Sequence, residues 1–455
     1  MTHKLFGTNG FRGIIGEELT PELSLNLGYA IGTVFKKRNV IVGSDNRLSN
    51  EMISNALISG LLAVGTKIYN AGMLPTPVLQ KYIKENAHID YGVMVTASHN
   101  PPEYNGFKVL DINGVEISDD IEKDIESIFN SKKFNFINWN QISPITTVKN
   151  VISEYIDGII GHIDLESIKN KKIKVVVDPN HGVTLNVIPQ LLKKIGCEVT
   201  VIHMNPDGSF PSRPPEPRPD NLHNLSDSVI KNGADFGVAF DGDGDRAIFC
   251  DEKGKIWWGD VSGIIIGSYL AKKQNCKLVV TPVTSSLATE ITLQKSGVKV
   301  IRTKVGSKNV AYEMIRENGI WGFEENGGGI YSPHLNARDG GISTLLLIQI
   351  IADYESSLSH IFETLPKFYQ EKIKIHCKLE NRTKIIDEIK NKYKNHKLDL
   401  IDGVKIWLKP ETWVLIRPSG TEPIIRIFSE ANTLTESQKT VQSFKTEILE
   451  ILSSL

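Results

Sequence analysis

Three aspartates occupy alternate positions in one short segment, 241–245, which reads DGDGD. Apolar runs at 236–240 and 247–250 flank this segment, so we expect a loop that joins two strands. Carboxylates separated by glycines can converge on one hard divalent cation, and without a cation their mutual repulsion is unfavourable. An EF-hand is excluded because its sixth position requires glycine, and Arg246 stands there. We expect a Mg²⁺ site formed by Asp241, Asp243 and Asp245, with a solvated acidic turn as the alternative.

A serine and a histidine are adjacent in the segment 96–102, which reads TASHNPP and follows an expected strand at 92–95. Two prolines constrain this turn. A hydroxyl beside an imidazole, here Ser98 beside His99, is a potential nucleophile next to a proton carrier. Adjacent side chains need not point the same way, so a helix cap or a plain turn is the alternative. The GxSxG elbow of α/β-hydrolases is absent from the sequence.

Two more polar loops contain glycine and follow expected strands. The segment 417–423 reads RPSGTEP and combines a guanidinium group, two hydroxyls and a glycine amide, which together suit a phosphate dianion. Arg426 is a candidate second contact, and the segment is not a Walker A loop. The segment 324–329 reads EENGGG, and its carboxylate and amide groups suit the recognition of sugar hydroxyls or an amino group. Taken singly, each loop could also be a simple turn.

The elements that must position these loops follow a repeated order of strand, polar turn, helix, glycine and strand. This order occurs at 40–69, 175–201 and 278–300. It is typical of a parallel sheet with crossover helices. The copies are separated by the length of a whole domain, so they predict three similar α/β domains in tandem rather than a solenoid. One large sheet containing all three copies is the alternative.

The chain after residue 366 has a different pattern. Strands are expected at 404–408, 413–417 and 424–428, followed by a helix with an apolar stripe formed by Val441, Phe444, Ile448 and Leu452. This order predicts a small α+β domain. We therefore predict an α/β fold of three tandem domains with mixed sheets and a C-terminal α+β domain, with boundaries at 1–150, 151–254, 255–366 and 367–455.

Composition excludes several classes of protein. The 455 residues include 52 lysines and arginines against 53 aspartates and glutamates, so no global basic field favours nucleic acid or an anionic membrane. The four cysteines form no CxxC pair, which fits a reducing cytoplasm. No signal-peptide pattern opens the sequence, and the apolar stretch 341–352 is too short to cross a membrane, so we expect a buried helix there. We expect a cytoplasmic protein without nucleic-acid or membrane partners.

The four loops occur in the order in which the α-D-phosphohexomutase family carries its active-site segments, one in each domain. TASHNPPEYNGFK is similar to the family's phosphoserine loop, DGDGDR to its metal loop, GFEENGG to its sugar-recognition loop and RPSGTEP to its phosphate-binding loop. FGTNGFRG, at 6–13, is similar to its opening segment. The resemblance covers essentially the whole chain. It implies three related α/β domains and a smaller fourth domain around one central cleft.

The resemblance also implies roles for individual residues. Ser98 would be phosphorylated in the resting enzyme, and Arg12, His99, Lys108 and Arg246 would surround the phosphoryl group that is transferred. Mg²⁺ would bind an oxygen of phosphorylated Ser98 as well as the three aspartates of the metal loop. The expected substrate contacts are Glu324 and Asn326 at the sugar, Arg417, Ser419, Gly420 and Thr421 at the phosphate that is not transferred, with Arg426 beside them, and Lys304 and Gly306 in a further loop lining the cleft.

The sequence departs from the family's pattern at four positions. The opening segment usually reads GTDG, but Asn9 replaces the aspartate, so one negative charge is missing near Arg12. Ser44 stands where many relatives carry arginine. Gly328 and Ser307 stand where some bacterial members carry histidines. These last two differences leave the identity of the general acid or base open.

The activity implied is that of a phosphohexomutase, an isomerase that interconverts hexose 6-phosphate and hexose 1-phosphate through a phosphoserine enzyme. Hexose 1,6-bisphosphate would be both intermediate and activator. The opening and phosphate loops most resemble members that act on glucosamine phosphate, and the sugar loop also resembles members of broad specificity toward mannose and glucose phosphates. A metal-dependent phosphatase or a non-catalytic sugar-phosphate binding protein would also fit these loops. The expected partner is a small sugar phosphate, and a homodimer remains open.

Overall fold

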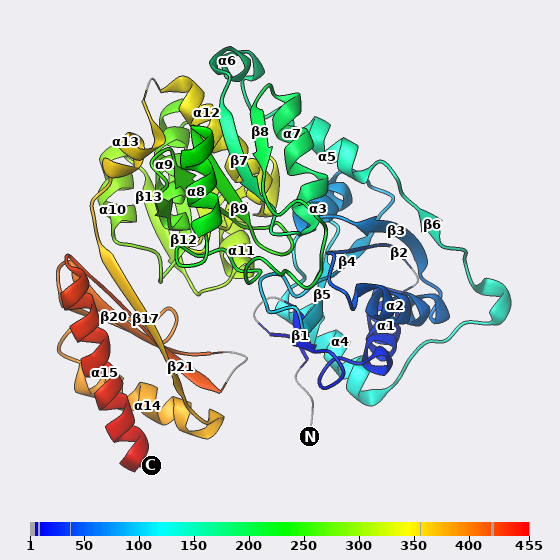
Figure 1. Cartoon of the computed structure of the whole chain (residues 1–455). Helices are drawn as coiled ribbons and strands as arrows, with labels where there is room; N and C mark the ends of the chain where they lie inside the picture. Colours follow the sequence, from blue (N-terminus) through cyan, green and yellow to red (C-terminus); the bar gives the residue numbers. More distant parts are fainter. Residues whose placement is uncertain (1–4, 8–9, 37, 355, 420–422, 455) are drawn as a thin grey trace. The chain divides into compact units, whose positions relative to one another are not determined.

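The structure is a computed structural model, and it describes residues 5–7, 10–36, 38–354, 356–419 and 423–454. The chain divides into two compact units. The first unit comprises Met1–Ile266 and Asn326–Phe362, and the second comprises Gly267–Glu325 and Glu363–Leu455. Each unit is described by itself below, with the labels of Figure 1.

The first sheet has the order β1-β5-β4-β2-β3-β6 and belongs to the first unit. Its strands are β1 (Phe11–Ile14), β2 (Asn39–Ser44), β3 (Lys67–Met73), β4 (Tyr91–Val95), β5 (Tyr104–Leu110) and β6 (Thr146–Thr147). Strand β2 pairs in parallel with β3 and β4, whereas β5 is antiparallel to β1 and β4, so the sheet is mixed as predicted. The parallel strands bring the carboxyl ends of β2 and β4 to the same edge of the sheet.

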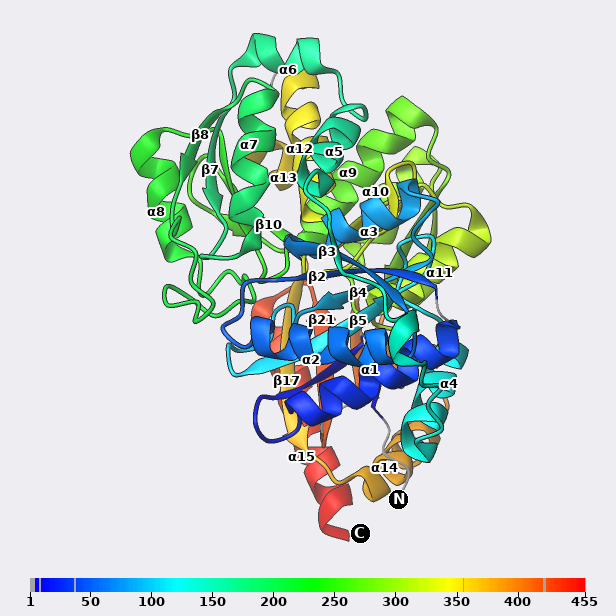
Figure 2. The same cartoon turned by 90° about the vertical axis from the view of Figure 1, so that its right-hand side faces the viewer.

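Helices cover both faces of this sheet. They are α1 (Pro21–Phe35), α2 (Asn50–Ala63), α3 (Thr76–Glu85) and α4 (Asp119–Ser131). Figure 2 shows α1 and α2 on one face and α3 on the other. Helix α1 begins where the Thr20 side chain accepts a hydrogen bond from the Leu23 amide and Pro21 occupies the first turn, a favoured N-terminal arrangement. The packed apolar side chains between these layers give the sheet a rigid base for its loops.

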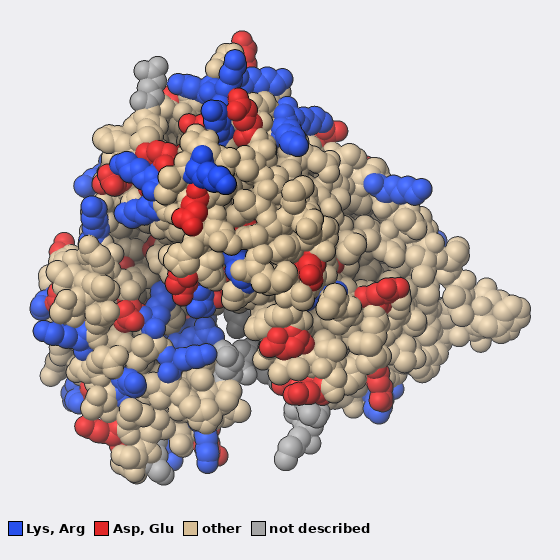
Figure 3. Space-filling model, viewed as in Figure 1, with Lys and Arg blue, Asp and Glu red and all other residues tan. Residues whose placement is uncertain are grey.

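An exposed, uncharged segment links the first sheet to the elements that follow it. Residues 134–148 contain no lysine, arginine, aspartate or glutamate, and Figure 3 shows the projecting part at the right as a surface without charged side chains. Its exposed apolar side chains include Phe136, Trp139, Ile142 and Ile145. After it come α5 (Val151–Ile160) and α6 (Leu165–Lys171).

The second sheet has the order β11-β10-β9-β7-β8 and also belongs to the first unit. Its strands are β7 (Lys174–Asp178), β8 (Glu198–Val201), β9 (Phe236–Phe240), β10 (Ala247–Asp251) and β11 (Ile256–Trp257), with the helices α7 (Ile188–Lys194) and α8 (His223–Asn232). Strand β7 is parallel to β8 and β9, whereas β9 and β10 are antiparallel. The acidic loop 241–245 therefore joins two strands, as predicted, and these strands are antiparallel.

The third α/β repeat is divided between the units. In the second unit, β12 (Leu278–Pro282) pairs in parallel with β13 (Lys299–Thr303) and β14 (Trp321–Phe323), with α10 (Ala288–Leu293) and α11 (Ser307–Glu317). In the first unit, β15 (Gly329–Tyr331) and β16 (Leu335–Arg338) form an antiparallel pair followed by α12 (Gly340–Asp353) and α13 (Leu358–Glu363). Helix α9 (Gly259–Gln274) contains the boundary. The buried helix predicted at 341–352 is α12.

The C-terminal part is an antiparallel sheet of order β17-β21-β20-β19-β18 with two helices. Its elements are β17 (Tyr369–His376), α14 (Leu379–Lys392), β18 (Lys397–Asp399), β19 (Val404–Lys409), β20 (Thr412–Pro418), β21 (Ile424–Ala431) and α15 (Leu434–Ser454). Three of the strands and the last helix were predicted, whereas β17 and β18 were not. The three repeats lie in different sheets, so the predicted fold class is confirmed and the single large sheet is wrong. Among the described residues, no helix is both long and apolar enough to span a bilayer.

A buried lysine in the second unit gives a testable pH dependence. Lys405 lies 3.7 Å from the ring centre of Trp413 and donates to the Val283 carbonyl at 2.9 Å. Burial, and then Arg302, lower the pKa of Lys405 to about 7. Between pH 7 and the ordinary pKa of lysine, Lys405 is therefore protonated in the unfolded chain and neutral in the folded chain. The free energy of unfolding should rise with pH in that window, by up to about 1.4 kcal/mol per pH unit.

We expect Lys405→Met to flatten this rise, as measured by urea unfolding between pH 6.5 and 9.5. Lys397→Met is the matched control, because Lys397 lies 5.0 Å from the ring of Trp407 but is exposed. Curves for Lys405→Met and the unmodified protein that stay parallel over this range would contradict the prediction.

Candidate active site

Ser98 lies in a sharply bent loop at the carboxyl end of β4. Its backbone has φ +50°, in the left-handed region, and its side chain is fully buried. Arg47, from the turn after β2, holds the loop by donating from both terminal nitrogens to backbone carbonyls of Ser98, Asn100, Pro101 and Tyr104 at 2.6–2.9 Å. Asp45 in turn accepts from Arg47 at 3.2 Å and from the Thr96 hydroxyl at 2.6 Å. The loop that carries the strained Ser98 is therefore held in place by residues that follow the neighbouring strand β2.

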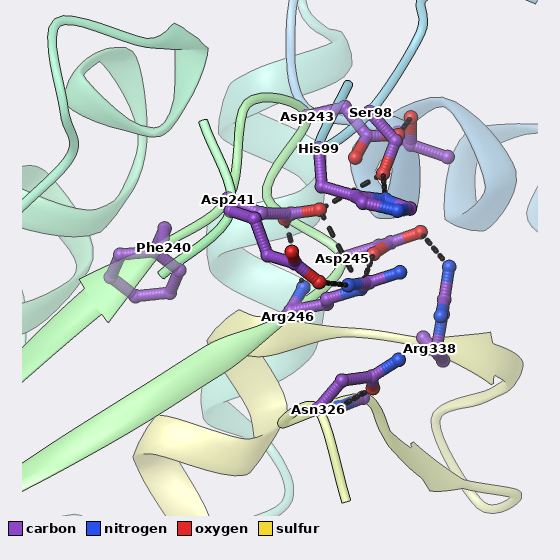
Figure 4. Close-up of polar contacts among 12 residues, drawn as sticks. Ser98, His99, Phe240, Asp241, Asp243, Asp245, Arg246, Asn326 and Arg338 are labelled. Atoms are coloured by element: carbon purple, nitrogen blue, oxygen red, sulfur yellow. Dashed lines mark hydrogen bonds and ion pairs between the residues drawn. The ribbon is translucent and has the colours of Figure 1, made fainter. Parts of the chain in front are cut away.

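The Ser98 hydroxyl lies between the predicted metal loop and His99. Its Oγ donates to Asp241 Oδ2 at 2.9 Å and lies 3.4 Å from Nδ1 of His99 (Figure 4). The two loops are in close contact, because a Cβ atom at Gly242 would lie 2.5 Å from the Ser98 carbonyl oxygen. The structure thus brings together the serine, the histidine and the first aspartate, which the sequence places 143 residues from Ser98.

The three aspartates of the metal loop converge. All three are buried, and one carboxylate oxygen from each lies within 4.8 Å of the others. Oδ2 of Asp243 accepts from Thr76 at 2.5 Å and from Lys108 at 2.7 Å, and Oδ2 of Asp245 accepts from Lys108 at 2.9 Å and from Arg338 at 2.7 Å. The Oδ1 atoms of Asp243 and Asp245 are buried without a hydrogen-bond partner. Such oxygens are suitable ligands for a hard divalent cation, so this donor set fits Mg²⁺.

The protonation behaviour of the aspartates follows from their neighbours. Burial, and then the charges of Asp245 and Asp243, raise the pKa of Asp241 well above its ordinary value. For Asp245, burial acts in the same direction, but Arg338, Lys108 and Arg246 outweigh it and lower the pKa. Asp241 is thus the carboxylate whose negative charge is least compensated by the protein. A bound cation would compensate it.

Lys108 and His99 differ in charge state. Burial opposes the charge of Lys108, but Asp243 and Asp245 outweigh it and raise its pKa, so the ammonium group stays protonated. Burial, and then Arg246, Arg12 and Arg338, lower the pKa of His99 well below its usual range, so its imidazole is neutral at pH 7. Of His99 and Lys108, only His99 has a free electron pair under these conditions and can accept a proton.

Two arginines beside the metal loop have buried N–H groups suited to an anion. Arg12 donates from Nη1 to Asn100 at 2.6 Å, whereas its Nη2 is buried without a hydrogen-bond partner. Arg246 donates from Nη1 to Glu216 at 3.2 Å, and its Nε is likewise without a hydrogen-bond partner. Guanidinium N–H groups left in this condition are costly unless an anion accepts from them.

The sugar-recognition loop predicted from the sequence crosses the boundary between the units. In the first unit, the Gly327 carbonyl accepts from the amide of Ala247, which places Asn326 beside the strand that follows the metal loop. In the second unit, Glu324 is buried directly after β14. The neighbouring Glu325 accepts from the Thr284 hydroxyl at 2.8 Å.

The second unit holds the remaining predicted substrate contacts. Arg417 and Arg426 are paired in register on β20 and β21, and Arg417 makes an ion pair with Asp402 at 2.9 Å. The Ser419 amide donates to the Ile424 carbonyl at 3.0 Å, and Gly420 and Thr421 lie outside the described residues. In the other loop of this unit, Lys304 is exposed and Gly306 precedes α11 with φ +126°, a conformation that requires glycine.

Sequence reasoning missed four residues that position this site: Asp45, Arg47, Thr76 and Arg338. Asp45 and Arg47 had a usable signal, because they follow a strand of the first repeat and parallel strands end at the same edge of a sheet. Thr76 and Arg338 had none that we can identify. Arg338 lies 93 residues from the aspartate it contacts, in a different repeat.

Family models match nearly the whole chain. Residues 3–136, 153–254 and 258–369 match the family models for α/β/α domains I, II and III of phosphoglucomutase/phosphomannomutase, and residues 375–450 match its C-terminal domain. The chain belongs to the phosphoglucomutase/phosphomannomutase family and is a phosphohexomutase, an isomerase that transfers phosphate within a hexose phosphate.

Individual relatives cover nearly the full length. The phosphoglucosamine/phosphogalactosamine mutase of Sulfurisphaera tokodaii is 43% identical over 453 residues, which cover 97% of this chain and 98% of the relative. The phosphoglucomutase/phosphomannomutase of Thermococcus kodakarensis is 41% identical over 437 residues, 94% and 95% of the two chains. The crystal structure of a family protein from Burkholderia thailandensis superposes with a TM-score of 0.87 at 25% identity, covering 99% of this chain and 98% of that one.

Proposed function

We propose that this phosphohexomutase works through a phosphorylated Ser98 and a hexose 1,6-bisphosphate intermediate. The observation that carries the proposal is the buried Ser98 hydroxyl, 2.9 Å from one of three convergent carboxylates and 3.4 Å from a neutral imidazole. A strained serine beside Asp241, the carboxylate whose charge the protein compensates least, is consistent with a site that binds a cation and a phosphoryl group.

The reaction has two phosphoryl transfers. In the first, the bond between phosphorus and Ser98 Oγ breaks, a bond forms to the free hydroxyl of the hexose monophosphate, and the proton of that hydroxyl leaves. In the second, the bisphosphate presents its other phosphate, which returns to Ser98 Oγ and leaves a hydroxyl on the sugar. Each transfer conserves phosphate, so the cycle ends with the isomer and the phosphorylated enzyme.

We assign the proton transfer to His99. Its low pKa keeps the imidazole neutral, so it can accept a proton from the attacking hydroxyl and return it to the departing one. Lys108 keeps its charge and acts as a fixed cation between Asp243 and Asp245. Arg12 and Arg246 would donate to the transferred phosphoryl group from N–H groups that have no hydrogen-bond partner in the protein. The oxygens of that phosphoryl group carry the charge in the transition state.

Asp241, Asp243 and Asp245 would hold Mg²⁺, together with the phosphate of Ser98. When bound, the ion neutralises negative charge on the phosphoryl group. The protein contributes the fixed arrangement of carboxylates, in which Thr76, Lys108 and Arg338 hold the Oδ2 atoms of Asp243 and Asp245.

We propose glucosamine phosphate as the preferred substrate and mannose and glucose phosphates as the alternative. The relative from Sulfurisphaera tokodaii bears an amino-sugar name, whereas the one from Thermococcus kodakarensis is named for glucose and mannose, at similar identity. Measuring kcat/KM for glucosamine, glucose and mannose 6-phosphates on one preparation separates the two. A higher value for either neutral sugar would overturn the preference.

The mechanism is tested by intact-mass measurement after incubation with glucose 1,6-bisphosphate. We expect one phosphoryl group per chain, located in the peptide that contains Ser98. A phosphatase working at the same serine would release inorganic phosphate as fast as it consumes sugar phosphate, and a binding protein would gain no mass.

The non-transferred phosphate should bind Arg417 and Arg426. Like charges directly opposite on paired strands repel, so an anion between them is stabilising. We expect Arg417→Ala to raise KM roughly ten- to hundredfold with a smaller change in kcat, because one charge-assisted hydrogen bond contributes about 1.5–3 kcal/mol. Arg316→Ala, at an exposed arginine of α11, is the control. An unchanged KM in steady-state kinetics of Arg417→Ala would contradict this assignment.

A further inference from the structure

The side chain of Arg338 fills the space that a side chain at position 328 would need. A Cβ atom at Gly328 would lie 2.2 Å from Cδ and 3.0 Å from Cγ of Arg338. The backbone of Gly328 is not in the left-handed region, so its conformation does not itself require glycine. Gly328 is also a position at which the sequence departs from bacterial family members that carry histidine. Here the volume at that position belongs to an arginine from another strand.

Arg338 uses this space to reach the metal loop. Its side chain is 2% exposed, and Nη2 donates to Oδ2 of Asp245 at 2.7 Å. Figure 4 shows Arg338 and Arg246 on one side of Asp245, and Ser98 and His99 on the other. With Lys108 on the same oxygen at 2.9 Å, Oδ2 of Asp245 accepts from two cationic side chains. Oδ1 has no hydrogen-bond partner and lies 3.8 Å from Nε of Arg246.

The backbone that carries Arg338 is itself anchored on the metal loop. The Gly340 amide donates to the Gly244 carbonyl at 3.3 Å, and the Asp339 amide donates to the Gly329 carbonyl at 2.9 Å. The Asp339 carboxylate accepts from the Tyr155 hydroxyl at 2.8 Å and caps α12 by accepting from the Gly341 amide at 2.7 Å. The two residues that follow Arg338 are therefore anchored, and Gly340 is bonded directly to the metal loop.

From this arrangement we infer that Arg338 is a positioning residue for the metal loop and that Gly328 is kept without a side chain to admit it. By holding Oδ2, Arg338 fixes the orientation of the Asp245 carboxylate within the loop that would bind the cation. The inference rests on the proposed function for the identity of that cation. Partners that orient a metal ligand in this way typically change metal affinity or activity by about 10- to 100-fold when removed.

A purely electrostatic role for Arg338 gives the opposite sign. An arginine that acts only as a nearby positive charge repels a cation, so its removal would tighten metal binding. An arginine that orients Asp245 favours binding, so its removal would weaken it. The direction of the change in metal affinity therefore distinguishes the two roles.

The experiment measures Mn²⁺ affinity of the full chain by electron paramagnetic resonance in four proteins: unmodified, Arg338→Ala, Gly328→Ala and the double variant. We expect about tenfold weaker binding in both single variants. The added methyl group of Gly328→Ala displaces an arginine that is chemically intact. Once Arg338 is truncated the methyl group has space, so the double variant should bind Mn²⁺ no more weakly than Arg338→Ala alone. Arg302→Ala is the control, because it removes an arginine in the other unit that pairs with a glutamate and also donates to backbone carbonyls.

Arg338→Lys is a further variant that keeps the positive charge. It tests the inference even if an alanine variant fails to fold. A lysine offers a single donor of shorter reach, so we expect partial recovery of Mn²⁺ affinity, together with a loss in kcat larger than the change in KM. Tighter or unchanged Mn²⁺ binding in Arg338→Ala, or additive losses in the double variant, would overturn the inference. Because Mn²⁺ binding is measured without substrate, failure of the Ser98 mechanism would not affect this result.

Discussion

Replacing Ser98 with alanine should lower mutase turnover by several orders of magnitude while the protein stays folded. The side chain is buried and donates a single hydrogen bond to Asp241, so the loss of stability should be small, about 1 kcal/mol. The loss of the group that carries phosphate between the two sugar positions has no substitute in the site, because a catalytic nucleophile cannot be replaced by its neighbours. The measurement is sugar phosphate isomerisation at saturating hexose bisphosphate.

Ser59→Ala is a suitable control, since Ser59 is an exposed serine of α2 whose hydroxyl bonds only to the Asn55 carbonyl among the contacts described. It should leave turnover unchanged. Binding of sugar phosphate to Ser98→Ala should persist, which separates loss of chemistry from loss of the site. Turnover of Ser98→Ala within tenfold of the unmodified protein would rule out a phosphoserine enzyme.

Replacing Asp241 with asparagine should have opposite effects on activity and on metal-free stability. We expect isomerisation to fall by more than about a hundredfold, because a ligand of the proposed cation is lost. Without divalent ions, however, the variant should unfold at a temperature no lower than the unmodified protein. Burial and the charges of Asp245 and Asp243 disfavour ionised Asp241, and an amide of the same shape keeps hydrogen-bonding groups toward Ser98 and the Arg246 amide.

The informative measurement is thermal unfolding with and without Mg²⁺. At Mg²⁺ concentrations above Kd, the free energy of unfolding of the unmodified protein should rise with the logarithm of the Mg²⁺ concentration. Asp241→Asn should show little or no such rise. Asp251→Asn is the matched control. Asp251 is also buried at an end of β10, but its carboxylate accepts from the Trp257 indole and two backbone amides, so its replacement should destabilise the fold and leave the Mg²⁺ response intact. An unchanged Mg²⁺ response in Asp241→Asn would contradict the proposed metal site.

The fold was predictable from the sequence where the information is local. Strands and helices of the three repeats follow from the alternation of apolar runs with polar turns, and the acidic loop follows from DGDGD between two apolar runs. The prediction of the C-terminal sheet was incomplete. Strands β17 and β18 carry lysines and partly exposed side chains, so they lack the apolar pattern that indicates a strand. In these strands pairing with β21 and β19 decides the conformation.

By itself the sequence determined which chemical groups are present, in which loops and in which order, because turn residues and short motifs act through neighbours along the chain. Only the tertiary structure decided how those groups behave. Ser98 meets Asp241 across 143 residues, Lys108 stays charged because two buried carboxylates surround it, and Arg338 occupies the space of an absent side chain at Gly328. Charge state, orientation and available volume depend on burial and on residues from distant strands, and no local pattern records them.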